Sequence, residues 1–302
     1  MNESSYEIID SRFARSVKLA EPVERIWTGG RWTEGPVYSA PWRSVIFSDI
    51  PNDRRLRYDE LTGAVGDHCS GQGAYTNGST MDQQGRLVMC HHGTRSVTRL
   101  EHDGRMTVLA DYFQHKKFNS PNDVVVKSDG SIWFTDPSYG IETDYEGFAA
   151  EPEQDGQHVY RISPTGEATR VASDFVCPNG LAFSLDESLL YIADSGATRY
   201  KDGPRHIRSF QVRGGTLKGG EVFATCEAGV FDGIRLDAQG RLWCSTAEGV
   251  HVYDPDGTLL GKILVPEEVS NLTFGGSKRN RLYITASSSL YTVLLASSGP
   301  LL

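Results

Sequence analysis

One repeated segment, about 47 residues long on average, constrains this chain of 302 residues more than any other feature. Each copy begins with an amide or acid side chain and continues as an apolar stretch. It then turns at Asp, Gly, Gln or Ser and ends in a second apolar strand. The copies begin at Glu34, Asn77, Asn122, Asn179, Asp232 and Asn271, with gaps of 43, 45, 57, 53 and 39 residues. Nearly the whole chain therefore consists of one repeated unit.

The residues within each repeat favour β-structure. Segments such as VVVKSDGSIWF are β-branched and aromatic, and they lack the 3.6-residue apolar period of a helix. The 32 glycines exceed the average usage of about 7% and are spread along the chain, which indicates many tight turns. A repeat of this length is typical of a four-stranded propeller blade, and propellers have four to eight blades. We therefore predict an all-β fold, a six-bladed β-propeller.

The predicted propeller occupies residues 1–302 as a single domain. Residues 1–22 precede the first repeat strands as an N-terminal extension. We expect the strand near residues 23–28 to complete the last blade beside residues 289–295, which would close the ring without exposed edges. The longest stretch between repeats, residues 139–157, is polar and acidic, and we interpret it as an insertion over one face and a candidate lid.

Charge and hydropathy exclude several classes of partner. The chain has 30 Lys and Arg against 39 Asp and Glu, a formal charge of −9, so it offers no broad basic surface for nucleic acid or anionic lipid. No stretch approaches the roughly 18 apolar residues of a membrane span, and the N-terminus lacks a secretory pattern, so we expect a cytoplasmic protein. The five cysteines form no CxxC pair and are expected to be reduced and mostly buried. The oligomeric state is left open.

The six residues that begin the repeats all carry a side-chain carbonyl or carboxylate oxygen. The first strand of a propeller blade lines the central channel, so these side chains should face one another. Two buried carboxylates, Glu34 and Asp232, are costly side by side unless a cation compensates them. Oxygen donors suit Ca²⁺ or Mg²⁺, and Ca²⁺ accepts the more irregular geometry. The pattern predicts a divalent metal in the channel, the alternative being that Asn-Gly and Asp-Gly pairs merely favour turns.

Several motifs resemble those of the SMP-30/gluconolactonase/luciferin-regenerating family, in its gluconolactonase branch. The similarity covers essentially the whole chain and implies a six-bladed propeller with a channel metal. It rests on WTEGPVY (32–38), NGSTMDQQGRLVMCHHGTRSVTR (77–99), NSPNDVVVKSDGSIWFTDPSYGI (119–141), PNGLAFSLDESLLYIAD (178–194), DGIRLDAQGRLW (232–243) and VHVYDPDGTLLGKILVPE (250–267).

The resemblance implies a set of metal ligands at four of the six repeat starts. They are Glu34 of EGPV, Asn122 of PND, Asn179 of PNG and Asp232 of DG. In some relatives the residue matching Asn122 serves the substrate more than the metal, so we assign it to both. The preferred metal is Ca²⁺, with another divalent cation as the alternative.

The remaining polar residues of these motifs are candidates for the wall of the substrate site. Asn77 is assigned to the cavity wall as a substrate-binding residue, and His92 of CHHG matches a family histidine that would contact the sugar lactone. His91 replaces a more usual glutamate, and which of the two histidines faces the cavity stays open at this point. For Arg95, a solvated position facing outward is favoured over a role in substrate binding.

The chemistry implied by the resemblance is hydrolysis of an aldonolactone, a small-molecule sugar lactone, to its aldonic acid. The metal would stabilise the oxyanion, while Asp232 orients or deprotonates the attacking water as the catalytic residue. Asp123 is the alternative base. Two other functions remain open: a broader lactonase or phosphotriesterase-like hydrolase on the same metal, and a non-catalytic calcium-binding propeller.

Other conspicuous residues have structural interpretations. Trp133 and Trp243 have the placement of blade cores, and Phe47, Phe134 and Tyr191 are interpreted in the same way. Within TDPSYG, the aspartate and tyrosine at 136 and 139 sit where a loop could cover the pocket. The basic cluster at 54–57 is interpreted as a solvated outer face.

Overall fold

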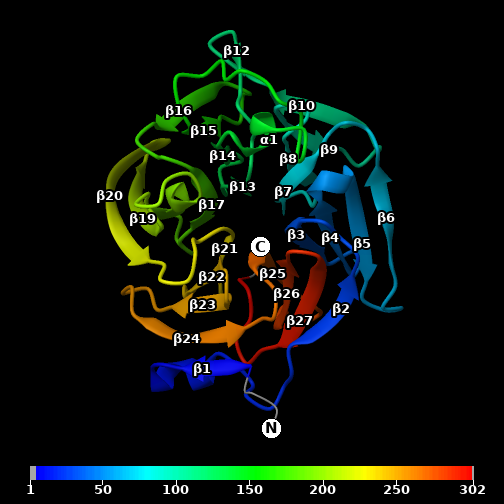
Figure 1. The fold of residues 1–302 in the computed structure, drawn as a ribbon, viewed down its shortest axis with the longest axis vertical. Helices are drawn as coiled ribbons and strands as arrows, with labels where there is room; N and C mark the ends of the chain where they lie inside the picture. The colour runs from blue at the N-terminus through cyan, green and yellow to red at the C-terminus, as the bar shows by residue number, and fades with distance from the viewer. Residues whose placement is uncertain (1–4, 301–302) are drawn as a thin grey trace.

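The computed structural model describes residues 5–300, which form six antiparallel sheets arranged in a ring (Figure 1). Residues 1–4 of the predicted N-terminal extension and residues 301–302 lie outside the described part. Each sheet contains four strands from consecutive or ring-closing segments, and one sheet gains a fifth strand. The predicted six-bladed β-propeller is therefore confirmed.

The strand order within the blades follows the chain, and the first strand of each repeat lies nearest the centre of the ring (Figure 1). Blade one comprises β3 (Thr33–Ser39), β4 (Ser44–Asp49), β5 (Arg54–Asp59) and β6 (Val65–Ser70). Blade two comprises β7 (Thr76–Met81), β8 (Leu87–His91), β9 (Ser96–Leu100) and β10 (Met106–Ala110), and blade three β13 (Val124–Val126), β14 (Ile132–Asp136), β15 (His158–Ile162) and β16 (Ala168–Ala172). Blade four comprises β17 (Pro178–Phe183), β18 (Leu189–Asp194), β19 (His206–Arg213) and β20 (Thr216–Thr225), and blade five β21 (Ile234–Leu236), β22 (Leu242–Thr246), β23 (Gly249–Tyr253) and β24 (Leu259–Leu264).

The last blade joins the two ends of the chain. It contains β25 (Val269–Gly275), β26 (Arg281–Ala286) and β27 (Ser289–Leu294), and its outermost strand is β2 (Glu24–Thr28) from the N-terminal side. β2 runs antiparallel to β27, with Thr28 opposite Ser289. The predicted closure of the ring is thus confirmed, and β2 covers the outer edge of β27.

The elements outside the blades are short. β1 (Tyr6–Ile8) pairs with β24 and adds a fifth strand to blade five, and β11 (Tyr112–Phe113) and β12 (Lys116–Lys117) form a small hairpin. The 3₁₀ turns are η1 (Ser11–Arg15), η2 (Ile50–Asn52) and η3 (Gly196–Thr198), and α1 (Tyr139–Glu142) is a single helical turn. Within residues 5–300, no helix is long and apolar enough to cross a membrane.

The hydrophobic core consists of six clusters, and each cluster lies between two neighbouring blades. Trp133 packs with blade four, whereas its sequence neighbour Phe134 packs with blade two. Both faces of a blade are therefore buried, which explains why the strands read as nearly continuous apolar runs. Trp133, Trp243, Phe47 and Phe134 are fully buried and Tyr191 is 4% exposed, so their prediction as core is confirmed.

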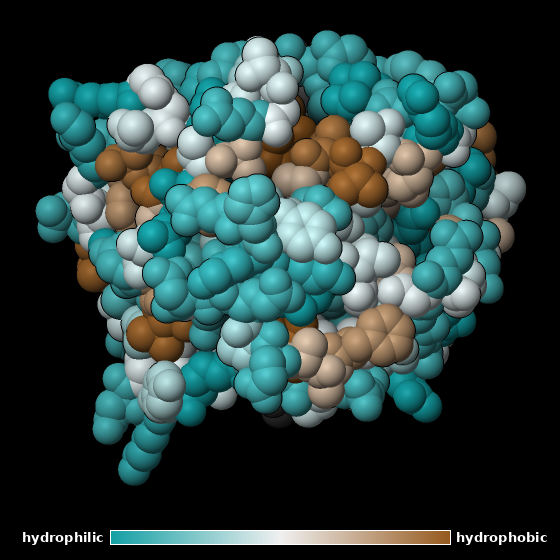
Figure 2. Space-filling view, turned by 90° about the horizontal axis from the view of Figure 1, so that it is seen from above, coloured by the Kyte–Doolittle hydropathy of each residue, from teal (hydrophilic) through white to brown (hydrophobic). Residues whose placement is uncertain are grey.

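The outer surface is largely hydrophilic, with hydrophobic residues gathered in a few groups on the side shown in Figure 2. All five cysteines are free, and all except Cys69 are buried.

The basic cluster at 54–57 differs from the prediction of a solvated outer face. Arg55 is only 7% exposed and lies between blades one and two. The side chain of Arg55 faces the neighbouring blade. The four-residue sequence alone does not show which of its side chains point inward.

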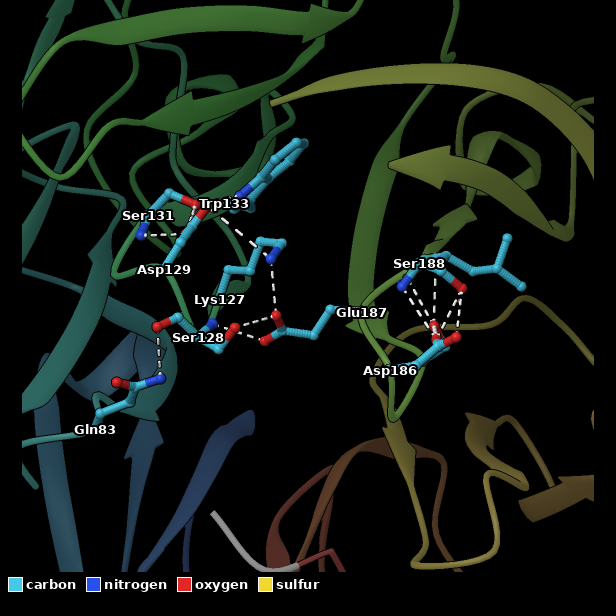
Figure 3. Close-up of polar contacts among 11 residues, drawn as sticks. Gln83, Lys127, Ser128, Asp129, Ser131, Trp133, Asp186, Glu187 and Ser188 are labelled. Atoms are coloured by element: carbon cyan, nitrogen blue, oxygen red, sulfur yellow. Dashed lines mark hydrogen bonds and ion pairs between the residues drawn. The ribbon is translucent and has the colours of Figure 1, made fainter. Parts of the chain in front are cut away.

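Polar contacts join the turns that follow the innermost strands, at the face of the ring opposite the repeat starts (Figure 3). Lys127 Nζ of blade three lies 2.8 Å from Glu187 Oε2 of blade four, and the Ser128 N–H donates to Glu187 Oε1 at 2.7 Å. Gln83 of blade two donates to the Ser128 carbonyl at 2.9 Å. Three consecutive blades are thereby tied together at this face.

Candidate active site

The six repeat starts lie at or near the beginning of the innermost strands, so all six are at the same end of these strands. Glu34, Asn77 and Asn179 are the second residues of β3, β7 and β17. Asn122 and Asp232 each come two residues before their strand, and Asn271 is the third residue of β25. Five of these side chains are 1–6% exposed, and Asp232 is partly exposed.

Glycine follows four of the six repeat starts because neighbouring inner strands approach closely there. A Cβ on Gly78 would lie 2.4 Å from the Asn122 carbonyl oxygen, and one on Gly180 would lie 2.0 Å from that of Asp232. The same two glycines donate their N–H groups to these carbonyls, at 2.8 and 3.0 Å. Of the four, only Gly35 has a positive φ. Close approach, rather than the turn chemistry considered as the alternative, therefore explains most of these glycines.

The two carboxylates among the repeat starts influence each other's ionisation. Burial, and then the charge of Asp123, raise the pKa of Glu34. Burial, and then the charge of Glu34, raise the pKa of Asp232 well above its usual range. Glu34 is held by the N–H of Gly35 and by Asn271 Nδ2, which donates to Glu34 Oε2 at 3.0 Å. The chain thus concentrates acidic groups at one end of the channel, where each opposes the ionisation of the others.

Asp123, the alternative base, has a different environment from Asp232. Its side chain is 1% exposed, its Oδ1 accepts the N–H of Val124 at 2.9 Å, and its Oδ2 lies 3.4 Å from Arg235 Nη1. The Asp123–Arg235 ion pair was not predicted from the sequence. No hydrogen bond within the described chain uses the carboxylate of Asp232, so it is the freer of the two groups.

The donor chemistry of these residues fits a hard divalent cation. Asn179 Oδ1 is buried without any hydrogen-bond partner, which is unfavourable unless a ligand satisfies it. Carboxylate and amide oxygens together are the donors that Ca²⁺ prefers. Among residues 5–300, His, Cys, Asp and Glu side chains form no group of three that could hold a metal by themselves, so a metal bound here would need amide oxygens as well.

His92 and Asn77 form a hydrogen-bonded pair in blade two. Asn77 Nδ2 lies 3.0 Å from His92 Nε2, and His92 Nδ1 lies 3.1 Å from the carbonyl oxygen of Glu146. Burial lowers the pKa of His92 to about 4, so the ring is neutral at pH 7 and donates through Nδ1 to Glu146. Both ring nitrogens are therefore used within the protein. Asn77 Oδ1 remains free for a ligand, and binding of substrate by His92 stays a prediction.

His91 and His92 face different parts of the molecule. His91 Nδ1 lies 2.9 Å from Thr76 Oγ1 and its Nε2 lies 2.7 Å from Thr98 Oγ1, between blades one and two.

The prediction that Arg95 is solvated and faces outward is wrong. Arg95 is 8% exposed, donates through Nε to the Phe118 carbonyl at 2.6 Å and lies 3.5 Å from Glu153. Arg95 therefore holds chain segments together rather than facing outward.

Asp136 does not lie over a pocket, because its side chain is fully buried. Its Oδ2 accepts the N–H of Asn119 at 2.8 Å, in the loop that leads to Asn122. The aspartate therefore fixes the backbone just before a predicted ligand. Its sequence neighbour Pro137 accepts a hydrogen bond from Ser120 Oγ at 2.7 Å, which holds the same loop.

The insertion at 139–157 is attached to two blades. Tyr139 Oη lies 3.0 Å from Thr198 Oγ1, and its ring lies 4.3 Å from the guanidinium carbon of Arg199. Arg199 also pairs with Glu142 at the end of α1. On the other side, a Cβ on Gly140 would lie 2.3 Å from His92 Cβ. The insertion thus spans from blade two to the loop after β18.

Glu146 of the insertion is an acidic group that the sequence did not single out. Burial raises its pKa to about 7, and its charge contributes to the raised pKa of Asp232. Arg199 Nε and Nη2 are buried without hydrogen-bond partners. The signal for Glu146 lay in the acidic composition of the insertion, which has no repeat register to show which side chain points inward.

Comparison with known proteins gives consistent similarities over the whole chain. The family profile described as "SMP-30/Gluconolactonase/LRE-like region" matches residues 32–288. A gluconolactonase of Zymomonas mobilis is 29% identical over 307 residues, covering 93% of this chain and 83% of the relative. The pentonolactonase XacC of Haloferax volcanii is 28% identical, covering 85% of this chain and 82% of the relative.

A solved structure is also similar in sequence and fold. The gluconolactonase structure from Xanthomonas campestris superposes with a TM-score of 0.90 at 36% identity. The match covers 97% of this chain and 95% of that one.

Proposed function

Because the chain belongs to the SMP-30/gluconolactonase/LRE-like family, we propose that it hydrolyses a sugar lactone to its aldonic acid with a divalent cation, preferably Ca²⁺, in the central channel. The similarity to a gluconolactonase and a pentonolactonase supports the reaction class. Two observations carry the metal: Glu34 and Asp232 lie close enough for each to oppose the ionisation of the other, and Asn179, next to the Gly180 that contacts Asp232, has a buried oxygen without a partner. Without a cation or hydrogen-bond donors to compensate them, such buried oxygens are unfavourable.

Each predicted ligand has a defined place in this proposal. Glu34, Asn179 and Asp232 would hold the cation, and Asn122 would contribute to the metal or to the substrate. Asn271 holds Glu34 in place through Oε2, leaving Glu34 Oε1 for the cation. When bound, the cation supplies Lewis-acid polarisation of the lactone carbonyl.

The proton transfer is assigned to Asp232. It is partly exposed and has no hydrogen bond of its own in the described chain. A bound cation would offset the neighbouring negative charges and favour the carboxylate form of Asp232, which would orient the attacking water and accept its proton. Asp123 is a poorer base because its carboxylate is engaged by Arg235 and by Val124. Asn77 Oδ1 would accept a hydrogen bond from a substrate hydroxyl, with His92 fixing the orientation of the amide.

The insertion at 139–157 would cover this end of the channel. Its attachment to His92 on one side and to Arg199 on the other supports a fixed cover rather than a free loop. A fixed cover would limit the size of the substrate and exclude water from all but one approach.

The test is hydrolysis of D-glucono-δ-lactone, followed by acid release with and without a chelator. We expect a metal-dependent rate above spontaneous opening in the wild type. Loss of a ligand charge in Glu34→Gln or Asp232→Asn should lower kcat/KM by about 100-fold or more. The exposed Glu167→Gln, which removes the same charge far from the channel, serves as the control. A rate that the chelator leaves unchanged would refute the metal-dependent mechanism.

The same assay separates the broader hydrolase from the lactonase. A phosphotriester such as paraoxon is run beside the lactone, under identical metal conditions. A higher kcat/KM for the phosphotriester would overturn the assignment to sugar lactones. Calcium binding without turnover of either substrate would indicate the non-catalytic alternative.

A further inference from the structure

The interface between blades one and two has the smallest apolar cluster of the ring. Its buried hydrophobic residues are Val37, Ile46, Leu87 and Met89. Beside them lies a cavity of about 230 Å³ that is lined by residues of both blades, with polar groups set in a mainly apolar wall. The space between these two blades is thus filled only in part by apolar packing.

Arg55 projects from β5 into this interface and lines the cavity together with Asp53 and Arg54. Three arginines are buried in the described chain, and two of them, Arg95 and Arg241, have a carboxylate within 4 Å. Arg55 has none among residues 5–300, and the one side-chain hydrogen bond of its guanidinium in this part of the chain goes from Nη1 to the thioether Sδ of Met89. A thioether is a weak acceptor that cannot offset a buried positive charge. The missing counter-charge is the unexplained feature of this site.

The other charged groups at the cavity are already engaged. The two carboxylate oxygens of Asp53 accept the N–H groups of Gly73 at 2.6 Å and Tyr75 at 2.8 Å. Arg54 Nε lies 2.9 Å from Asp49 Oδ2. Asp53 keeps its negative charge but forms no ion pair with Arg55, and Arg54 is a second cation.

Hydroxyl groups supply further donors around the cavity. Thr94 Oγ1 and Ser96 Oγ lie 2.8 Å apart, so one hydroxyl donates to the other and the acceptor keeps its own O–H free. His91 bridges the hydroxyls of Thr76 and Thr98. Burial, and then the charge of Arg55, lower the pKa of His91 to about 3, so the ring is neutral. A neutral imidazole has one N–H, so one of its two threonine partners also keeps an O–H free.

We propose that this cavity binds a small oxyanion of the phosphate type, with the Arg55 guanidinium as its principal ligand and the cavity hydroxyls as additional donors. A planar guanidinium binds such oxygens through paired hydrogen bonds. The ligand is either free phosphate or the phosphoryl group of a sugar phosphate. This site is separate from the channel and does not depend on the proposed lactonase activity.

The test is calorimetric titration of sodium phosphate into the protein as purified, without added calcium and with ionic strength held constant by NaCl. We expect saturable binding of one phosphate per chain with a dissociation constant of about 1 mM or tighter. Arg55→Gln should weaken binding by about tenfold or more. Glucose 6-phosphate forms a second arm: tighter binding than phosphate indicates a phosphoester, and weaker binding indicates the free ion.

Arg57→Gln is the matched control, because Arg57 is on the same strand, its side chain is 40% exposed and it pairs with Asp59 outside the cavity. It should bind phosphate as the wild type does. If Arg55→Gln does not fold, as judged by circular dichroism, Ser96→Ala replaces it, and we expect a few-fold loss of affinity. Absence of saturable binding in the wild type, or equal affinity in the cavity variant used, overturns the proposal.

Discussion

Aspartates at the ends of second blade strands fix the backbone that leads into the channel. Asp136 is the last residue of β14, and Asp49 and Asp194 occupy the same place in β4 and β18. Asp49 accepts the N–H groups of residues 31 and 32, and Asp194 accepts those of residues 176 and 177. In each case the bonded loop lies a few residues before a predicted ligand. In these three blades one aspartate therefore fixes the entry of the chain into the innermost strand.

Asp136→Asn should change how stability depends on pH. Burial raises the pKa of Asp136 to about 8, above its unfolded value near 3.9. Between these values the folded state keeps a proton that the unfolded state releases, so the contribution of this group to stability falls as pH rises from about 4 to 8 and is constant above. Asparagine does not titrate, so the wild-type minus variant difference in unfolding free energy should fall by up to about 1.4 kcal/mol per pH unit.

Urea unfolding at pH 5, 6, 7 and 8 measures this difference. Asp174→Asn, at a side chain that is 64% exposed, is the control and should give a flat difference over the same range. Parallel stability curves for the wild type and Asp136→Asn would show that Asp136 is ionised in the folded protein.

At the scale of elements, the innermost strands of neighbouring blades are positioned by direct contacts with each other's backbones. Gly180 and Gly78 donate to carbonyls of the next blade, and Ser270 Oγ donates to the Thr33 carbonyl at 2.6 Å across the closing interface. The spacing of predicted ligands is thus set by backbone contacts between strands. A side chain inserted at such a contact would move a whole strand.

Gly180→Ala should test this coupling. Its Cβ would meet the Asp232 carbonyl oxygen at 2.0 Å, so β17 and β21 have to separate. We expect a loss of about 2 kcal/mol or more in unfolding free energy, together with weaker calcium binding because Asp232 shifts. Thermal unfolding with and without calcium reports both effects. Gly66→Ala on the outer strand β6, where a Cβ meets nothing within 4 Å, should leave both unchanged.

At the scale of the whole molecule, the N-terminal strand β2 completes the blade begun by the C-terminal strands. Ile26 and Trp27 of β2 pack against the cluster that joins blades six and one. Removing the strand would expose the edge of β27 and uncover this cluster.

A chain lacking residues 1–28 should therefore be much less stable than one lacking residues 1–9. The shorter deletion removes β1, which pairs with the outer edge of β24 and contributes Tyr6 alone to the cluster between blades five and six. We expect the longer deletion to lower Tm by more than about 10 °C, or to cause aggregation, and the shorter one to have a small effect. Calorimetry and size-exclusion chromatography distinguish the two chains. Equal Tm values would mean that closure by β2 contributes little.

The sequence revealed the architecture because each blade obeys the same local rules, so one pattern appears six times. The repeat starts could be found for the same reason: equivalent positions line the channel. The directions of His91 and Arg55 could not be predicted, since they depend on packing between blades far from the repeat period. Glu146 lies in an insertion that occurs once, where no second copy indicates which side chain turns inward.

The contact between Asn271 and Glu34 has a consequence for synthesis. The two residues belong to the last and the first blade, and β2 pairs with a strand that ends at residue 294. A nascent chain on the ribosome therefore carries Glu34 through most of translation without the residue that positions it. The protein can acquire its complete channel only after the final blade has left the ribosomal exit tunnel.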